Sequence, residues 1–265
     1  MKTIQLSAIC ALFLAWAGVA SAATDVKPAA ITVVSLQGEA RYSVDGQSWH
    51  PLVVGKILHA GAVIETAAGS SANLILSGNP VPIPQSDSSA PQSIAQLGQA
   101  PDPNLRGYES YKPMAQQNVV SMGADTMLAV DKLTVIDTGV DTVGDTELDL
   151  RAGKVFVNAK KLSAGSQYII KLPNGVAGIR GACFNLDVFG HCNCLFGQVV
   201  LSIIGPNGQP ILIPVVGGYS YNPQTGQLTN LSPLDTLILK AFGYNTQTLY
   251  VQSIGTAHDL TIIYI

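Results

Sequence analysis

The sequence has little charge and no run of basic residues. Charged residues make up 12% of its 265 residues, and the formal net charge is −3 at pH 7. Nucleic acids and anionic lipid surfaces are bound by clustered Lys and Arg, so the composition argues against both classes of partner. Low charge together with 26 glycines favours an extracytoplasmic β-protein with polar turns over a helical cytosolic enzyme.

The sequence also lacks the patterns of common catalytic centres. No nucleophile elbow around a serine and no H-E-x-x-H motif occurs. The histidines are scattered along the chain, at His50, His59, His191 and His258. We therefore expect a protein that is not an enzyme and that uses no cofactor.

A group of acidic residues is the most site-like feature of the sequence. Its members are Asp137, Asp141, Asp145, Glu147 and Asp149. Such residues could bind Ca²⁺, and a pair such as Asp145 and Asp149 could act as general acid and base in a carbohydrate-active enzyme. Solvent-facing positions in strands and turns explain the same pattern, and we favour them because Asp and Gly are turn formers.

The N-terminus predicts export. Lys2 precedes an apolar stretch at residues 9–20, and Ala20-Ser21-Ala22 follows as a cleavage site, so residues 1–22 are expected to be a signal peptide. The apolar stretch is short for a membrane anchor. We expect a periplasmic or extracellular protein of the cell envelope, with no membrane span after cleavage.

Three cysteines would remain after export, namely Cys183, Cys192 and Cys194. An odd number leaves one cysteine unpaired or paired between chains. The sequence His191-Cys192-Asn193-Cys194 offers three ligands within four residues, whereas zinc sites usually need four at wider spacing, so we expect no metal. If a hairpin turns near Gly190, Cys192 and Cys194 share a strand face, Cys183 lies on the opposite strand, and its pairing stays open.

Short β-branched runs separated by glycines predict strands, for example at residues 30–44, 70–76 and 127–136. Residues 80–118 contain seven prolines and predict a long loop or disordered insertion. Residues 233–244 predict a helix that Ser232 can cap. Four of its apolar residues fall on one helical face: Leu234, Leu237, Ile238 and Ala241.

A faint repeat of the form G-x-[AV]-x-[YVL]-[SN] begins at Gly38, Gly153 and Gly197. Glycine inside a strand marks a bend or bulge where backbones approach closely. The repeat suits stacked short strands that turn corners, but it is equally the ordinary pattern of a glycine-rich β-protein.

Four motifs together resemble the FecR domain family, in its free-standing exported form. They are W-x-P-L-x-V-G at 49–55, G-A-V-I-E-T-A-A-G-S-S-A-N-L at 61–74, L-D-L-R-A-G-K-V at 148–155 and P-N-G-V-A-G-I-R-G at 173–181. The resemblance implies an all-β extracytoplasmic domain that binds rather than catalyses. In the regulators that name the family, this domain receives a signal from an outer-membrane receptor and passes it to a sigma factor.

Two departures from that family pattern bear on function. No anti-sigma segment precedes the leader and no internal membrane span is expected, so we do not expect this chain to regulate a sigma factor by itself. Where the family often has Thr after Arg-Gly, this sequence has Ala182 followed by Cys183.

Arg180 lies between Gly178 and Gly181 in an otherwise apolar run. We expect it to be a buried structural residue that donates to carbonyl groups at a bend, with a clamp for a ligand carboxylate as the alternative. The glycines Gly153, Gly178, Gly181 and Gly197 are expected to be structural as well. Tyr108, Tyr111, Tyr219 and Tyr221 could line a sugar-binding face, but they more simply pack or lie exposed one by one.

The sequence thus predicts an all-β fold, a FecR-like β-roll or solenoid-like stack of short strands with one short C-terminal helix. The β domain is expected at 30–220, and a C-terminal extension at 221–265 holds the helix and could add a final strand. We expect an envelope binding or scaffolding module for a protein or a cell-wall polymer. The alternatives are a self-associating structural protein and a carbohydrate-active enzyme.

Overall fold

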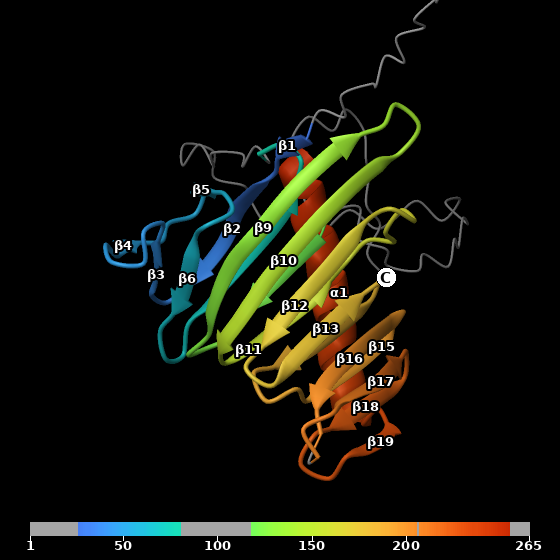
Figure 1. Ribbon diagram of the computed structural model, residues 1–265. Coiled ribbons are helices and arrows are strands. Elements are labelled where there is room, and N and C mark those ends of the chain that lie inside the picture. Colours follow the sequence, from blue (N-terminus) through green and yellow to red (C-terminus); the bar gives the residue numbers. More distant parts are fainter. Residues whose placement is uncertain (1–25, 81–117, 206, 255–265) are drawn as a thin grey trace, which may run out of the picture.

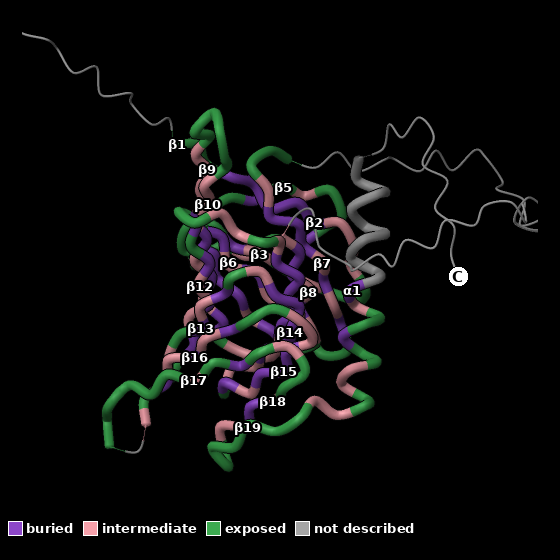
Figure 2. The backbone as a smooth tube through the Cα atoms, turned by 90° about the vertical axis from the view of Figure 1, so that its right-hand side faces the viewer, coloured by how far each residue is buried: buried purple, intermediate pink, exposed green. Residues whose placement is uncertain are grey.

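The computed structural model describes residues 26–80, 118–205 and 207–254, with the backbone alone for residues 244–254. These residues form two β-sheets that pack face to face and one helix, α1, on the outer face of the second sheet (Figures 1 and 2). The expected leader, nearly all of the proline-rich insertion and the expected final strand lie outside the described residues.

Sheet A has the order β17-β16-β13-β12-β10-β9-β6-β3-β4, and β1 pairs with β9 beside this path. Its strands are β1 Val26–Pro28, β3 Ala40–Ser43, β4 His50–Pro51, β6 Val63–Thr66, β9 Met127–Asp137, β10 Thr142–Ala152, β12 Gln167–Leu172, β13 Gly175–Ile179, β16 Gln198–Ile204 and β17 Pro210–Val216. Strands β10 and β12 run parallel, and the other neighbours in this sheet are antiparallel.

Sheet B has the order β19-β18-β15-β14-β11-β8-β7-β2-β5, with antiparallel neighbours throughout. Its strands are β2 Ala30–Gln37, β5 Ile57–Leu58, β7 Ser71–Ser77, β8 Asn118–Met122, β11 Lys154–Asn158, β14 Cys183–Asp187, β15 Cys192–Phe196, β18 Tyr219–Asn222 and β19 Gln227–Asn230. The expected domain boundary at residue 220 falls within β18, and β19 continues the sheet beyond it.

The core lies between the two sheets because alternate residues of each strand point to the same side. In β10, Leu148 and Leu150 are buried while their neighbours face outwards, and in β14 Phe184 and Leu186 enter the same core from sheet B. One continuous cluster of buried apolar side chains therefore joins the sheets along their length.

Glycines stand where the chain passes from one sheet to the other. Gly38 lies between β2 and β3, Gly153 between β10 and β11, and Gly197 between β15 and β16, all with φ between +76° and +82°. A Cβ atom on Gly153 would lie 2.6 Å from the carbonyl oxygen of Asp125, so a larger residue there needs both a strained backbone and a displaced neighbour. The repeat seen in the sequence thus marks the corners of the stack.

The predicted fold class is confirmed: the described chain is built from strands in two sheets, with a single helix near the C-terminus. Helix α1 spans Pro233–Ile254 and begins where the sequence predicts. The backbone N–H of Asp235 donates to the Ser232 hydroxyl at 3.0 Å, which caps the helix. The helix continues ten residues further than the expected end at 244. No helix in the described part of the chain combines the length and apolarity needed to cross a membrane.

The face of α1 that packs against sheet B is not the apolar face predicted from the sequence, which we call the apolar stripe. Leu234, Leu237 and Ile238 are 67%, 67% and 40% exposed, whereas Leu239 is fully buried. The ring of Phe242 packs against Phe156 of β11, with 5.7 Å between the ring centres. The outer face of sheet B carries polar as well as apolar side chains, so the polar contacts at the start of the helix help to set its rotation.

Candidate functional site

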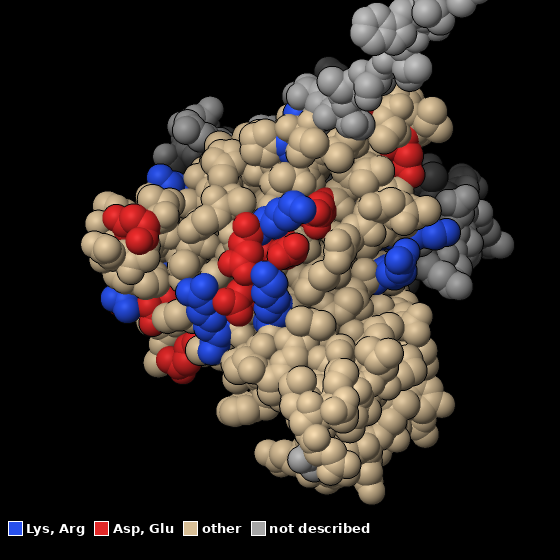
Figure 3. Space-filling model, viewed as in Figure 1, with Lys and Arg blue, Asp and Glu red and all other residues tan. Residues whose placement is uncertain are grey.

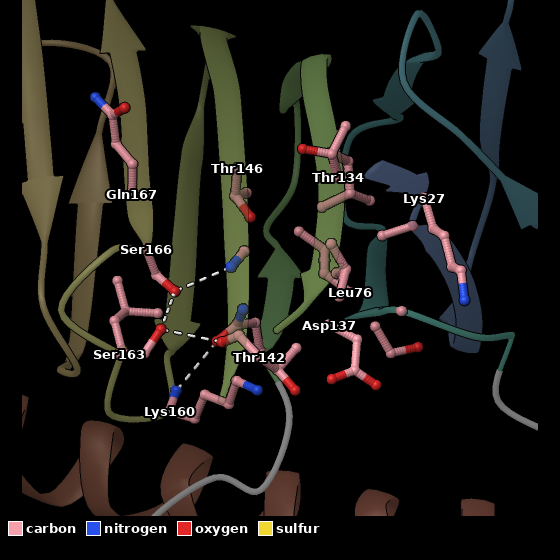
Figure 4. Close-up of a pocket in the computed structure, with 18 of the residues that line it drawn as sticks. Lys27, Leu76, Thr134, Asp137, Thr142, Thr146, Lys160, Ser163, Ser166 and Gln167 are labelled. Carbon is pink, nitrogen blue, oxygen red and sulfur yellow. Dashed lines mark hydrogen bonds between the residues drawn. The ribbon is translucent and has the colours of Figure 1, made fainter. Parts of the chain in front are cut away.

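A polar cleft with a volume of about 660 Å³ opens between the sheets, near the turn that joins β9 to β10 (Figure 4). The connections β6–β7, β8–β9 and β10–β11 all cross between the sheets at the opposite end. At the cleft end, the β1–β2 and β11–β12 connections cross between the sheets, and both contribute residues to the lining of the cleft. The size is in the range of small-ligand sites.

One wall of the cleft is fixed by a pair of serines in the segment that connects β11 to β12. The Ser166 hydroxyl accepts a hydrogen bond from the backbone N–H of Gly144 at 2.9 Å. The Ser163 hydroxyl donates to the carbonyl oxygen of Thr142 at 3.0 Å, and the two serine oxygens lie 2.6 Å apart (Figure 4). These bonds hold the connecting segment against β10 and give the wall a defined shape.

Three lysines and two aspartates line the cleft: Lys27, Lys160, Lys161, Asp137 and Asp141. Both carboxylates accept bonds from turn amides, Asp137 from the N–H of Gly139 at 2.9 Å and Asp141 from the N–H of Thr142 at 2.8 Å. Lys160 and Lys161 form no ion pair with any described residue. The balance of charge in the cleft is positive, which favours an anionic ligand.

The acidic residues singled out in the sequence do not form one site. Asp137 and Asp141 belong to the turn at the cleft, while Asp145, Glu147 and Asp149 lie on the outer face of sheet A (Figure 3). There each carboxylate has a basic partner: Asp145 pairs with Lys132, Glu147 with Lys171 at 3.0 Å and Asp149 with Arg151 at 2.7 Å. These pairs explain the acidic residues as parts of a solvent-facing surface.

Asp145 and Asp149, the pair considered from the sequence, are too far apart to act together as general acid and base. Asp145 and Asp149 are four residues apart in one strand, so their Cα atoms are separated by roughly 13 Å at the strand rise of about 3.3 Å per residue. The paired carboxylates of glycosidases lie about 5–9.5 Å apart. No group of His, Cys, Asp and Glu in the described part of the chain is arranged to hold a metal ion.

The cysteine hairpin has the expected geometry. Strands β14 and β15 pair with Leu186 opposite Cys192 and Phe184 opposite Cys194, and the turn includes Gly190. Cys192 and Cys194 point into the core, whereas the Cys183 sulfur approaches the carbonyl oxygen of Leu239 in α1 at 3.9 Å. All three are free and fully buried.

Burial also determines the chemistry of these thiols. Loss of solvation raises the pKa of Cys183 and of Cys194 to about 12 and raises that of Cys192 well above its usual range. The thiols are therefore protonated near neutral pH and poorly reactive. Neither a disulfide between chains nor a metal bound at the His191–Cys194 segment fits these enclosed positions.

Arg180 requires a correction. It lies in the bend that follows β13 and its side chain is exposed. No hydrogen bond or ion pair joins it to another described residue, so the premise of a buried guanidinium paired with carbonyl groups was wrong. The alternation of side chains along a strand explains this, because Ile179 points into the core and the next residue, Arg180, points to the solvent. A structural role for Arg180 stays a prediction.

The two glycines beside it differ from each other. Gly181 has a φ of +83°, and a Cβ atom there would lie 2.9 Å from the Cα of Lys161, which makes it a tight corner between β13 and β14. Gly178 has no such φ, and its nearest neighbour would be the carbonyl oxygen of Val200 at 3.8 Å, an ordinary contact. At Gly197, the corresponding Cβ atom would lie 2.7 Å from the Cα of Ala182.

The tyrosines do not make a sugar-binding face in the described residues. Tyr221 is 4% exposed and packs in the core, while Tyr219 is 38% exposed. Tyr108 and Tyr111 lie outside the described residues. The histidines are also apart: His50 and His59 lie near the N-terminal edge, His191 at the β14–β15 turn, and His258 outside the described residues.

Sequence reasoning missed the cleft because its lysines and hydroxyl groups come from distant parts of the chain. The doublet Lys160-Lys161 was visible, but Lys27 joins it only through the pairing of β1 with β9. Ser163 and Ser166 carry no motif, and their role depends on the parallel placement of β12 beside β10.

Comparison with known families bears on the middle of the chain. Residues 113–199 match the family model described as FecR protein. This segment is FecR-like. The resemblance predicted from the motifs is thereby confirmed over less than half of the chain, and the match includes the motifs at 148–155 and 173–181. The FecR-like segment contains β8 to β15, and with them most of the cleft lining, from Asn118 to Gln167.

No curated protein is a significant sequence match to the chain. Two solved structures are similar to parts of it, both titled "putative anti-sigma factor" and both from Parabacteroides distasonis. One is 14% identical with a TM-score of 0.32, and the alignment covers 46% of this chain and 55% of that one. The other is 12% identical with a TM-score of 0.35, and the alignment covers 57% of this chain and 74% of that one.

Proposed function

We propose that this chain is an exported FecR-like module that binds an acidic partner in the cell envelope through the polar cleft. The leader-like N-terminus supports export, and the FecR-like segment supports a role in binding and signalling rather than catalysis. Binding at the cleft would be the input step of such signalling. The partner is a protein segment or a cell-wall polymer that carries carboxylate or phosphate groups.

The excess of lysine in the cleft is the observation that carries this proposal. Lys160 and Lys161 line a site whose two aspartates accept hydrogen bonds from turn amides. The serine pair and the hydroxyl of Thr146 add polar groups along the wall. A partner with negative charge gains attraction from the lysines, which outnumber the aspartates of the lining by three to two.

Charge reversal in the cleft tests the proposal. Full-length chain with Lys160→Glu and Lys161→Glu is compared with wild type by affinity purification from the cells that produce it, and the amount of co-purified partner is measured. We expect at least a ten-fold loss, equivalent to about 1.4 kcal/mol, because two attractive charges become repulsive.

The matched control is Lys240→Glu, which reverses an exposed lysine on α1 away from the cleft lining. It should leave recovery of the partner unchanged, and circular dichroism should show that all variants keep the wild-type β-structure. Equal recovery with the cleft variant and wild type would overturn the proposal.

Self-association is a second candidate, favoured by the exposed apolar stripe of α1. Leu237 and Ile238 lie about one helical turn after Leu234, and all three are on an exposed face that no described residue covers. A second copy of the helix could bury this stripe. The partner in that case is the chain itself, and the surface used is α1 rather than the cleft.

Assembly through the edge of sheet A is less favourable than assembly through the helix. Gly205 N–H donates to the carbonyl of Gln209, and Gly217 N–H donates to that of Gly197, so the backbone N–H and C=O groups of odd-numbered residues in β17 point towards β16. The backbone groups of the even-numbered residues point to the open edge of the sheet, at Pro210, Leu212, Pro214 and Val216. The two prolines have no N–H to offer another strand, which protects this edge from pairing.

A further inference from the structure

A second groove lies at the other end of the sandwich from the cleft, beside the corner at Gly38. Its volume is about 670 Å³, and it shares no lining residue with the cleft. The lining comes from the β2–β3 corner, the residues around β4, and the end of β6. It lies outside the segment matched by the FecR family model.

A fixed indole ring forms one wall of this groove. The guanidinium carbon of Arg41 lies 4.5 Å from the centre of the Trp49 ring, a cation–π contact. The Nε of Arg41 donates to Glu65 Oε2 at 2.7 Å. Arg41 lies in β3 and Glu65 opposite it in β6, so an ion pair between two paired strands positions the guanidinium over the ring.

The rest of the groove combines an apolar floor with a polar rim. Leu36 and the buried Leu52 supply the floor, and Glu39 and His50 stand at the rim. The backbone of Glu39 is fixed on both sides, since its N–H donates to the Ser70 hydroxyl at 2.9 Å and its carbonyl accepts from Ala67 N–H at 2.9 Å.

We infer that this groove binds a neutral carbohydrate, with one pyranose ring against Trp49 and its hydroxyl groups at the carboxylates and His50. An aromatic wall suits the apolar face of a sugar ring, and carboxylates accept bonds from hydroxyl groups. An anionic ligand meets two carboxylates, Glu39 and Glu65, against one arginine.

Tryptophan fluorescence of the full chain provides the test. The chain has two tryptophans, Trp16 and Trp49, so Trp16→Phe leaves the groove residue as the only indole. The probes are tetra-N-acetylchitotetraose and cellotetraose, two neutral oligosaccharides. We expect a saturable change in Trp49 emission with at least one of them, at a Kd between roughly 10 µM and 1 mM.

Calorimetry with variants then assigns the binding to the groove. Trp49→Ala should weaken the affinity at least ten-fold and Trp49→Phe should retain most of it, because phenylalanine keeps an aromatic face. Glu65→Gln should weaken binding by releasing Arg41 from its position. Tyr219→Ala, which removes an exposed aromatic residue elsewhere, should change nothing.

Three results would overturn the inference: no saturable change with either oligosaccharide, an affinity that Trp49→Ala leaves unchanged in a folded protein, or stronger binding of tetralysine than of both oligosaccharides. The inference does not depend on the proposed function, because the groove and the cleft share no residue. Loss of binding in the cleft variant and loss in the groove variant are separate outcomes.

Discussion

Tyr168 carries a polar group in the centre of the apolar core. The residue is 1% exposed in β12, and its hydroxyl has no hydrogen-bond partner among the described residues. Burial raises the pKa of this phenol, so the hydroxyl stays protonated and its donor stays unused. A buried polar group without a partner lowers stability by the cost of its lost hydration.

Tyr168→Phe should therefore stabilise the protein, by about 1 kcal/mol in the free energy of unfolding, because the ring keeps its packing and the unpaired hydroxyl is removed. Urea denaturation followed by circular dichroism measures the change. Tyr221→Phe is the control: Tyr221 is also buried, but its hydroxyl is not among the buried atoms without a partner. A loss of stability in Tyr168→Phe would show that the hydroxyl is hydrogen-bonded after all.

Single residues were predicted best where the backbone itself sets the requirement. Gly153 and Gly197 lie at corners, one of the two interpretations that the sequence allowed, and their positive φ and close backbone contacts leave few alternatives to glycine. Arg180 was misjudged because its exposure depends on which way one strand residue points, and the apolar neighbours on both sides did not reveal this.

At the scale of elements, α1 is tied to sheet B by a short polar chain. Asn193 Nδ2 donates to Asp235 Oδ1 at 3.2 Å, and the Ser220 hydroxyl donates to Asn193 Oδ1 at 2.6 Å. Asp235 also accepts from the hydroxyl of Ser232, the cap of the helix. Capping and docking thus depend on the same carboxylate.

We expect Asp235→Ala and Asn193→Ala to be coupled. Each variant should destabilise the protein, and the double variant should lose less than the sum, with a coupling energy of about 0.5–2 kcal/mol, because both changes remove the same contact. Urea denaturation of the four proteins gives this energy. Lys240→Ala, on an exposed position of the same helix, serves as the unconnected control. Additive losses would contradict the account of how α1 is held.

Strands and the helix start could be predicted from local pattern, since β-branched runs, glycine punctuation and the Ser232 cap are local signals. The face of α1 that contacts sheet B could not be predicted in this way. Leu234, Leu237 and Ile238 satisfy the helical period, but the face that contacts the sheet is determined by Asn193 and Phe156, which lie far away in the sequence. The helical period indicates which residues share a face of the helix, but it does not indicate whether that face contacts the sheet or the solvent.

At the scale of the whole molecule, both candidate sites are products of topology. The cleft lies at the end where the β1–β2 and β11–β12 connections cross between the sheets, and the groove forms where the β2–β3 corner meets β6. The FecR-like motifs predicted the class of fold, and the family match confirms them over residues 113–199. The lysines of the cleft and the Arg41–Trp49 wall depend on strand pairing, which no motif encodes.

The two exposed surfaces offered by the molecule make different demands on a partner. The cleft is positive and polar, whereas the α1 stripe is apolar. The outer face of sheet A differs from both, because its acidic and basic side chains form ion pairs with one another (Figure 3). A partner held at the cleft should contact Gln167, which is exposed at its edge, and a second copy should contact Leu237.

The most direct measurement is photocrosslinking in the cells that produce the protein, with p-benzoylphenylalanine placed at Gln167 or at Leu237 in the full chain. We predict an adduct with another molecule from position 167, which Lys160→Glu with Lys161→Glu abolishes, because the cleft binds the partner through its charge. An adduct from position 237 alone, with the mass of two copies of this chain, would contradict the binding role of the cleft and support self-association through α1.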